Sequence, residues 1–197
     1  MSINFANQGK ASDQVIEQIN LRYSEILLIR EIGEVASRIL EPEILLKYIS
    51  EALSKRLHFS RGMIMLTNID RTRLIYVSGY GYNTNEENII NEANFSLDNP
   101  NSKGIFYTAF FNQEPFIVNN VTDITSNLSD KTIKFINDLK VKSFICVPII
   151  YEGKSEGILA VDNSKSEFPA TQSDLSLLTG IAQQIGISLN NARAHKK

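Results

Sequence analysis

The sequence predicts an α/β protein of the α+β type, built on a mostly antiparallel sheet of five or six strands. Two short apolar runs rich in β-branched residues flank a glycine-bounded turn within residues 143–163, which indicates a hairpin. Residues 61–68 and 73–78 show a second pair of such runs. Apolar residues recur at helical spacing in residues 13–57 and 173–194. We expect these long terminal helices to cover one face of the sheet, with shorter helices and loops on the other.

The hairpin of residues 143–163 is expected at the centre of the fold. Neither of its runs alternates apolar with polar residues, so both faces of these strands should be covered. Pro148 lies within the first run, and proline cannot donate a hydrogen bond to a strand ladder. We therefore expect a bulge or an edge position there.

Length and composition are those of one folded domain with extensions. The chain has 197 residues, of which 43% are hydrophobic, enough for a packed core. We expect a mobile leader over residues 1–12 and a single domain over residues 13–197. A net charge of −2 without a basic run argues against a nucleic-acid partner. No apolar run is long enough to span a bilayer, so we expect no membrane contact and a cytoplasmic location.

The N-terminal region predicts two helices separated by a proline. Ser12 or Asp13 could cap the first helix. Pro42 should interrupt it, because a proline ring clashes with the preceding helical turn. A second helix should begin at Pro42 and continue to Leu57.

The middle of the chain predicts short elements. Residues 83–94 are polar and rich in Asn and Glu, which we interpret as an exposed loop with a helical turn. Apolar spacing predicts short helices over residues 104–112 and 130–139, and residues 115–118 predict a short strand. Residues 119–130 are expected to form another loop.

A long helix should close the chain. Thr171 followed by Asp174 resembles a capping box in which Asp replaces the usual Glu or Gln. The apolar stripe that follows runs nearly to the end of the chain, and its later part fits a seam between helices.

The terminal helices predict a homodimer. The early stripe of the first helix precedes the expected domain core, and the late stripe of the last helix should run past the end of the sheet. Two chains related by a two-fold axis would bury both stripes, most simply as a parallel helical bundle. The competing interpretation is a monomer whose N-terminal segment folds back along its own domain. The interface candidates are Ile16, Ile19, Tyr23, Ile26, Ile185, Leu189 and Ala192.

No constellation of catalytic or metal-binding residues is visible in the sequence. His58 and His195 are far apart and match no ligand motif, so no metal is expected. The only cysteine, Cys146, lies in an apolar strand and predicts a buried, inert thiol. Nucleophile and phosphate-loop motifs are also missing, so the sequence predicts a protein that is not an enzyme.

The central hairpin and the last helix carry a family resemblance. The run Ser-Phe-Ile-Cys-Val-Pro-Ile-Ile, a glycine-bounded turn, Gly-Ile-Leu-Ala-Val-Asp-Asn, Phe168 and the run Asp-Leu-Ser-Leu-Leu at residues 174–178 occur in this order. This order resembles the C-terminal half of a GAF domain, and the resemblance covers roughly residues 24–194.

The resemblance implies a non-catalytic sensor or regulatory module of a signal-transduction protein. Such a module would bind a small molecule of unknown identity and act through its terminal helices on an output domain outside this chain, such as a kinase, cyclase or transcription domain. One alternative is a structural dimerisation module with a vestigial pocket. Another is an enzyme that reduces free methionine sulfoxide, but the relatives of that type use several cysteines, and this chain has one.

No cofactor is evident, and the resemblance argues against two known ligands. Cyclic-nucleotide-binding members carry Asn-Lys, a spaced Phe, and Asp-Glu near the last strand–helix junction. The nearest equivalents have the wrong spacing, and Leu175 stands where the Glu would be. A covalent bilin requires a cysteine at a position that Cys146 does not match. The nearest equivalents of the nucleotide motif are Asn163, Lys165, Phe168 and Asp174.

An aromatic cluster within residues 106–116 is the candidate pocket wall. Plain core packing is the simpler explanation of the cluster. In GAF domains the ligand lies between one sheet face and the helix–loop segments on that side, which predicts a pocket opposite the terminal helices. The polar candidates could orient a ligand or could be solvated turn residues. The candidates are Phe106, Tyr107, Phe110, Phe116, Asn120, Asp123 and Thr125.

Overall fold

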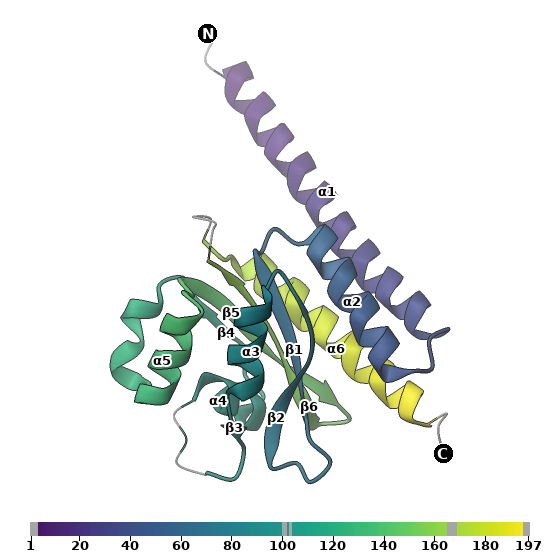
Figure 1. The fold of residues 1–197 in the computed structure, drawn as a ribbon. Coiled ribbons are helices and arrows are strands. Elements are labelled where there is room, and N and C mark those ends of the chain that lie inside the picture. The colour runs from purple at the N-terminus through teal and green to yellow at the C-terminus, as the bar shows by residue number, and fades with distance from the viewer. Residues whose placement is uncertain (1–3, 100–101, 103, 165–168, 195–197) are drawn as a thin grey trace.

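The protein is described from a computed structural model that covers residues 4–99, 102, 104–164 and 169–194. One antiparallel sheet of six strands has the order β3-β2-β1-β6-β5-β4 (Figure 1). The strands are β1 (Arg61–Thr67), β2 (Arg73–Tyr80), β3 (Phe95–Ser96), β4 (Phe116–Val118), β5 (Ser143–Tyr151) and β6 (Lys154–Asn163). The helices are α1 (Asn4–Ala36), α2 (Pro42–Arg56), α3 (Thr84–Glu92), α4 (Ile105–Asn112), α5 (Asp130–Asp138) and α6 (Gln172–Ala194), with short 3₁₀ turns at Val121–Asp123 and Thr125–Asn127. The predicted fold class is confirmed.

The β5–β6 hairpin lies inside the sheet, as predicted. β6 pairs with β1 on one side and β5 on the other, and β5 pairs with β4. The pairing of β5 with β4 ends at Cys146. At Pro148, β5 therefore pairs with β6 on one side only. The register of the hairpin also shifts between Ile149 and Ile150. Pro148 therefore has an edge position on the β4 side, one of the two arrangements predicted for it, and the irregularity follows it between Ile149 and Ile150.

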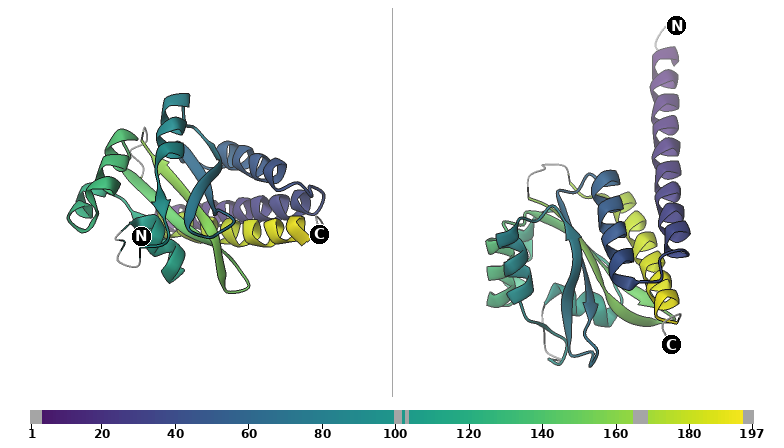
Figure 2. Two further views of the ribbon diagram at one scale, coloured as in Figure 1. Left: turned by 60° about the horizontal axis from the view of Figure 1, so that its bottom comes forward. Right: turned by 45° about the vertical axis from the view of Figure 1, so that its right-hand side comes forward.

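Two hydrophobic cores lie on opposite faces of this sheet. Helices α2 and α6 pack on one face, with α1 against both of them, and α3, α4 and α5 lie on the other face (Figures 1 and 2). Ile145 and Val147 of β5 pack in the core beneath the terminal helices, whereas Phe144 and Cys146 pack in the opposite core. Both sets are buried, which explains why the sequence of this strand shows no polar alternation.

The terminal helices pack closely over the sheet. Pro42 is the first residue of α2, so the predicted break after the first helix is confirmed. The Glu31 carboxylate on α1 accepts hydrogen bonds from the hydroxyl of Tyr48 (3.1 Å) and the guanidinium of Arg56 (2.7 Å), both on α2. A Cβ atom at Gly180 of α6 would lie 2.8 Å from Cδ1 of Ile29, so glycine permits the close approach of α1 and α6 there.

The N-terminal helix begins earlier than predicted. Residues 4–12, which we expected to form a leader, are helical, so α1 begins before the predicted cap at Ser12 or Asp13; residues 1–3 lie outside the described part. Extension of an existing helix adds one hydrogen bond for each residue fixed, so these polar residues continue α1 without an apolar signal of their own. As a result α1 projects well beyond the rest of the domain (Figure 1).

The predicted late seam of α6 is wrong. Ile185, Leu189 and Ala192 are buried in the core against the chain's own sheet. The β5–β6 hairpin reaches to Tyr151 and Lys154, so it supports the end of α6 that we expected to run past the sheet. These three residues are therefore not available to a second chain.

The segment after β2 is more ordered than predicted. The expected loop over residues 83–94 contains helix α3, in which Ile90 is buried. The side chain of Asn83 accepts from the backbone N–H of Glu86 (3.0 Å), and the Glu86 carboxylate accepts from the backbone N–H of Asn83 (2.8 Å). This capping box stabilises a helix whose apolar pattern is weak.

The start of α6 has the capping box that the sequence predicts. The Asp174 carboxylate accepts from the backbone N–H of Thr171 (2.7 Å), and the Thr171 hydroxyl accepts from the backbone N–H of Asp174 (3.2 Å). The shorter Asp therefore performs the role of the usual Glu.

The burial of α6 predicts unequal effects for two neighbouring isoleucines. Ile185→Ala should lower the free energy of unfolding by roughly 2–5 kcal/mol, because its side chain is 0% exposed and its loss leaves a cavity. The control Ile187→Ala removes a side chain that is 45% exposed and should change this free energy by about 0.5 kcal/mol or less. Urea unfolding measures both. Equal losses would contradict the described placement of α6.

Candidate ligand cavity

A cavity of about 730 Å³ lies on the sheet face opposite α1, α2 and α6. Met63, Leu74, Phe144 and Ala160, from four different strands, form its apolar floor. Residues of α3, β3, α4 and α5 and of the loops between them form its walls. The volume lies in the range of small-molecule sites, and the location is the one that the sequence predicted for a pocket.

Three phenylalanines from separate elements meet in the cavity wall. Phe95 of β3, Phe106 of α4 and Phe135 of α5 all line the cavity. Ring centroids of Phe95 lie 5.0 Å from those of both partners, and Phe106 and Phe135 are 6.2 Å apart. Tilted and edge-to-face pairs at these distances are favourable because ring edges and ring faces carry opposite partial charges.

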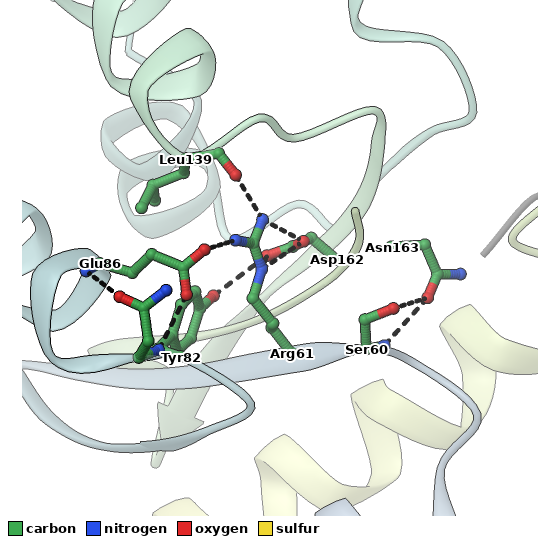
Figure 3. A network of polar contacts seen from close by, with 8 residues as sticks. Ser60, Arg61, Tyr82, Glu86, Leu139, Asp162 and Asn163 are labelled. Carbon is green, nitrogen blue, oxygen red and sulfur yellow. Dashed lines mark hydrogen bonds and ion pairs between the residues drawn. The ribbon is translucent and has the colours of Figure 1, made fainter. Parts of the chain in front are cut away.

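A buried ion pair between Arg61 and Asp162 adjoins the cavity, which Asp162 lines; Figure 3 shows the polar contacts of this pair. Arg61 at the start of β1 is 2% exposed, and its Nε and Nη2 donate to Oδ1 of Asp162 on β6 at 2.9 and 2.7 Å. Nη1 donates to Oε1 of Glu86 (2.8 Å), and Nη2 also donates to the carbonyl oxygen of Leu139 (2.8 Å). One guanidinium thus connects the sheet to α3 and to the end of α5.

The charge of Asp162 is compensated by two neighbours. The hydroxyl of Tyr82 donates to its Oδ2 (3.1 Å), and the Arg61 guanidinium lies 5.1 Å from the centroid of the Tyr82 ring. Burial raises the pKa of Asp162, and the hydrogen bonds and charge of Arg61 oppose this rise without reversing it. Burial alone would lower the pKa of Arg61, but the hydrogen bonds to Asp162 and its negative charge outweigh burial, so the pKa of Arg61 is raised. This pair was not predicted from the sequence. Its signal is a charged residue at one end of each of two apolar runs, Arg61 before residues 62–66 and Asp162 after residues 157–161.

Among the described residues, four charged side chains line the cavity rim; all are exposed, and two carry each sign. Glu92 and Asp138 carry negative charge, and Lys131 and Lys134 carry positive charge. Nζ of Lys131 donates to the carbonyl oxygen of Asn94 (2.8 Å). Such charges are largely screened by solvent.

The predicted aromatic candidates divide into two groups. Phe106 and Tyr107 line the cavity. Phe110 is buried in the same core, where it contacts Phe111 and lies 5.9 Å below the Arg71 guanidinium, but it does not line the cavity. Phe116, on the edge strand β4, packs in that core and is not part of the lining either. For these two, core packing is the correct interpretation.

The predicted polar candidates are turn residues and do not line the cavity. The side-chain oxygen Oδ1 of Asn120 accepts from the backbone N–H of Thr122 (3.2 Å), and its side-chain Nδ2 donates to Oδ1 of Asp123 (3.2 Å). The hydroxyl of Thr125 donates to the backbone oxygen of Thr122 (3.0 Å). Their side chains stabilise a 3₁₀ turn, so the pocket prediction is wrong for Asn120, Asp123 and Thr125.

The remaining sequence candidates for chemistry are structural or lie outside the described part. Cys146 is fully buried in β5, where burial raises the pKa of its thiol. His58 stacks on Phe59 and lies 3.7 Å from Asp174. The described residues contain no group of three or more His, Cys, Asp or Glu side chains placed to hold a metal ion. His195, Lys165 and Phe168 lie outside the described residues.

The family model described as "GAF domain" matches residues 41–189. The chain belongs to the GAF domain family. A comparison with curated proteins gives no match. Within the described residues, no helix of this GAF domain is long and apolar enough to cross a membrane.

Solved structures confirm the fold. A methyl-accepting chemotaxis protein (residues 122 to 287) is 22% identical, with a TM-score of 0.69 over 84% of this chain and 98% of the other. The GAF domain of a phosphoenolpyruvate-protein phosphotransferase from Coxiella burnetii is 14% identical (TM-score 0.70, 88% and 97%). The free methionine-R-sulfoxide reductase of Neisseria meningitidis, solved with its substrate, is 15% identical (TM-score 0.66, 85% and 89%). The neighbours thus include both signalling proteins and enzymes.

The ion pair predicts a strong dependence of stability on Arg61. Arg61→Met should cost roughly 3–5 kcal/mol at pH 7, because Asp162 keeps a buried charge without its partner. Since burial raises the pKa of Asp162, this loss should be small below about pH 4 and should grow as pH rises through that pKa. The control Arg30→Met breaks an exposed pair with Glu34 and should cost about 1 kcal/mol or less. Equal losses in urea unfolding would contradict this role.

Proposed function

We propose that this GAF domain is a non-catalytic regulatory module that binds a small molecule in the cavity. The terminal helices α1 and α6 would pass the change to an output domain outside this chain, such as a kinase, cyclase or transcription domain. One observation carries the proposal: the cavity floor and the surface that supports α6 are opposite faces of the same strands. The presence of chemotaxis and phosphotransferase proteins among the structural neighbours agrees with it.

A single layer of strands separates the cavity from α6. Phe144 and Ala160 face the cavity, while their neighbours Ile145 and Leu159 pack in the core of the terminal helices. In that core Ile181 of α6 is fully buried. If a ligand binds one conformation of the cavity floor more tightly than another, it would favour the position of α6 that accompanies the first conformation. The ratio of the two affinities sets how far the equilibrium shifts.

Catalysis of the sulfoxide-reducing type is a poor fit to this chain. Its single cysteine is buried, does not line the cavity and has a raised pKa, whereas the reactive form of a cysteine is the thiolate. The resemblance to reductase structures is below 25% identity and concerns the fold.

Thermal unfolding with a metabolite library tests ligand binding. A compound at 100 times its Kd should stabilise the native state by about 2.7 kcal/mol. Phe106→Ala should reduce this shift because Phe106 lines the cavity, whereas Phe111→Ala, on the same helix but outside the lining, should preserve it. A library without any compound whose shift depends on Phe106 would instead favour the second candidate, a dimerisation module with a vestigial pocket.

An exposed apolar stripe in the middle of α1 supports the proposal of a homodimer. Ile16, Ile19, Tyr23 and Ile26 are each between 55% and 62% exposed and are spaced three, four and three residues apart. This spacing forms one apolar seam of the coiled-coil type. The N-terminal part of α1 projects from the domain, where an isolated helix would be marginal (Figure 2), and the seam ends near Glu25, which accepts a hydrogen bond from Ser173 of α6. A second copy in parallel would place the same residues opposite one another.

Sedimentation at micromolar concentration tests this dimer. The wild-type chain should have twice the monomer mass of 22.2 kDa. Ile19→Asp with Ile26→Asp should give the monomer, because each charge would be buried in the seam. Ile69→Asp changes a 99% exposed isoleucine in the β1–β2 turn and should leave the dimer intact. A monomeric wild type, or a dimer unaffected by the double substitution, would refute the seam.

A further inference from the structure

We infer that the cavity selects an uncharged, mainly apolar ligand that carries a flat ring. This inference rests on the proposed function, since it names the class of molecule that the cavity would bind. Three features of the described lining support it. The buried charges of Arg61 and Asp162 are already paired, the charged side chains at the rim are exposed, and three aromatic rings form one wall.

The buried carboxylate at the floor is already satisfied. Oδ1 of Asp162 accepts from two nitrogens of Arg61, and Oδ2 accepts from the hydroxyl of Tyr82. The remaining nitrogen of the guanidinium, Nη1, donates to Glu86. Neither member of the pair is therefore available as a counter-charge, and a ligand ion that competed for one would leave the other buried without compensation.

The charges at the rim cannot replace a buried counter-ion. Lys131, Lys134, Glu92 and Asp138 are all exposed, with two residues of each sign. A charged group on a ligand that entered the apolar interior would lose its hydration without gaining a desolvated partner of opposite charge. The same penalty applies to the anionic phosphate of a cyclic nucleotide. A neutral molecule avoids this cost and gains from the burial of apolar surface.

The aromatic wall favours a ring. Phe95, Phe106 and Phe135 approach from three elements at tilted and edge-to-face angles of 54° to 87°. Faces and edges of these rings offer complementary partial charges to a further ring placed beside them.

Three probes of one shape test the inference: 2-naphthylmethanol, 2-naphthoate and 2-naphthylmethylammonium. They are respectively neutral, negative and positive at pH 7. Isothermal titration calorimetry of the protein should show that the alcohol binds at least about tenfold more tightly than either ion. Only the ions must bury a charge without a partner of opposite sign. Tighter or equal binding of either ion, or no binding of the alcohol, would overturn the inference.

Matched variants place the probe in the cavity. Phe106→Ala should weaken binding of the alcohol by about tenfold or more, whereas Phe111→Ala removes a phenylalanine of the same helix that is 50% exposed and should not. Phe135→Leu keeps an apolar side chain but removes a ring, and it serves if Phe106→Ala does not fold. Binding that none of the cavity variants weakens would refute the site.

The library experiment separates the two proposals. A charged metabolite that stabilises the wild type but not Phe106→Ala would contradict the neutral ligand class and would support the regulatory function. Absence of any Phe106-dependent ligand, in the library and among the naphthalene probes, would contradict both.

Discussion

The β5–β6 hairpin has no face that tolerates water, and the surrounding elements are placed by the need to cover it on both sides. Ile145 and Val147 require the terminal helices on one face, and Phe144 and Cys146 require α4 and its neighbours on the other. The helical side is closely packed, as the contact of Gly180 with Ile29 shows. The opposite side is covered by shorter elements that leave a cavity over the same strands. Both the fold and the candidate site therefore follow from one doubly buried hairpin.

The Arg61–Asp162 pair determines how the cavity side is held together. Its hydrogen bonds join β1 and β6 to Glu86 of α3 and to the backbone at the end of α5, and these two helices form part of the cavity wall (Figure 3). A buried ion pair of this kind contributes little net stability compared with apolar packing, but removal of one partner is costly. Because Arg61 and Asp162 are paired with each other, neither of these buried charges is available to pair with a charged ligand. The same contacts that fix the walls thus restrict the chemistry of the space between them.

Much of this arrangement could be predicted from local sequence signals. The apolar runs around Pro148 indicate doubly buried strands, and Thr171 with Asp174 marks the start of α6. The errors arise where the deciding interaction is not local. The partners Arg61 and Asp162 are far apart in sequence, so their proximity depends on the pairing of β1 with β6. Ile185 looked like part of an exposed seam because the length of the hairpin beneath it was not known. The candidates Asn120 and Thr125 had suitable chemistry, but only the structure shows that they stabilise a turn.

The cavity and α6 lie on opposite faces of β5 and β6, so a ligand in the cavity should also stabilise α6. Amide hydrogen exchange with and without saturating 2-naphthylmethanol tests this coupling most directly. Binding should slow exchange in β5 and β6 and also in α6, because a ligand that stabilises the floor stabilises the helix packed on its other face. Slower exchange confined to α3, α4 and α5, with α6 unchanged, would contradict the claim.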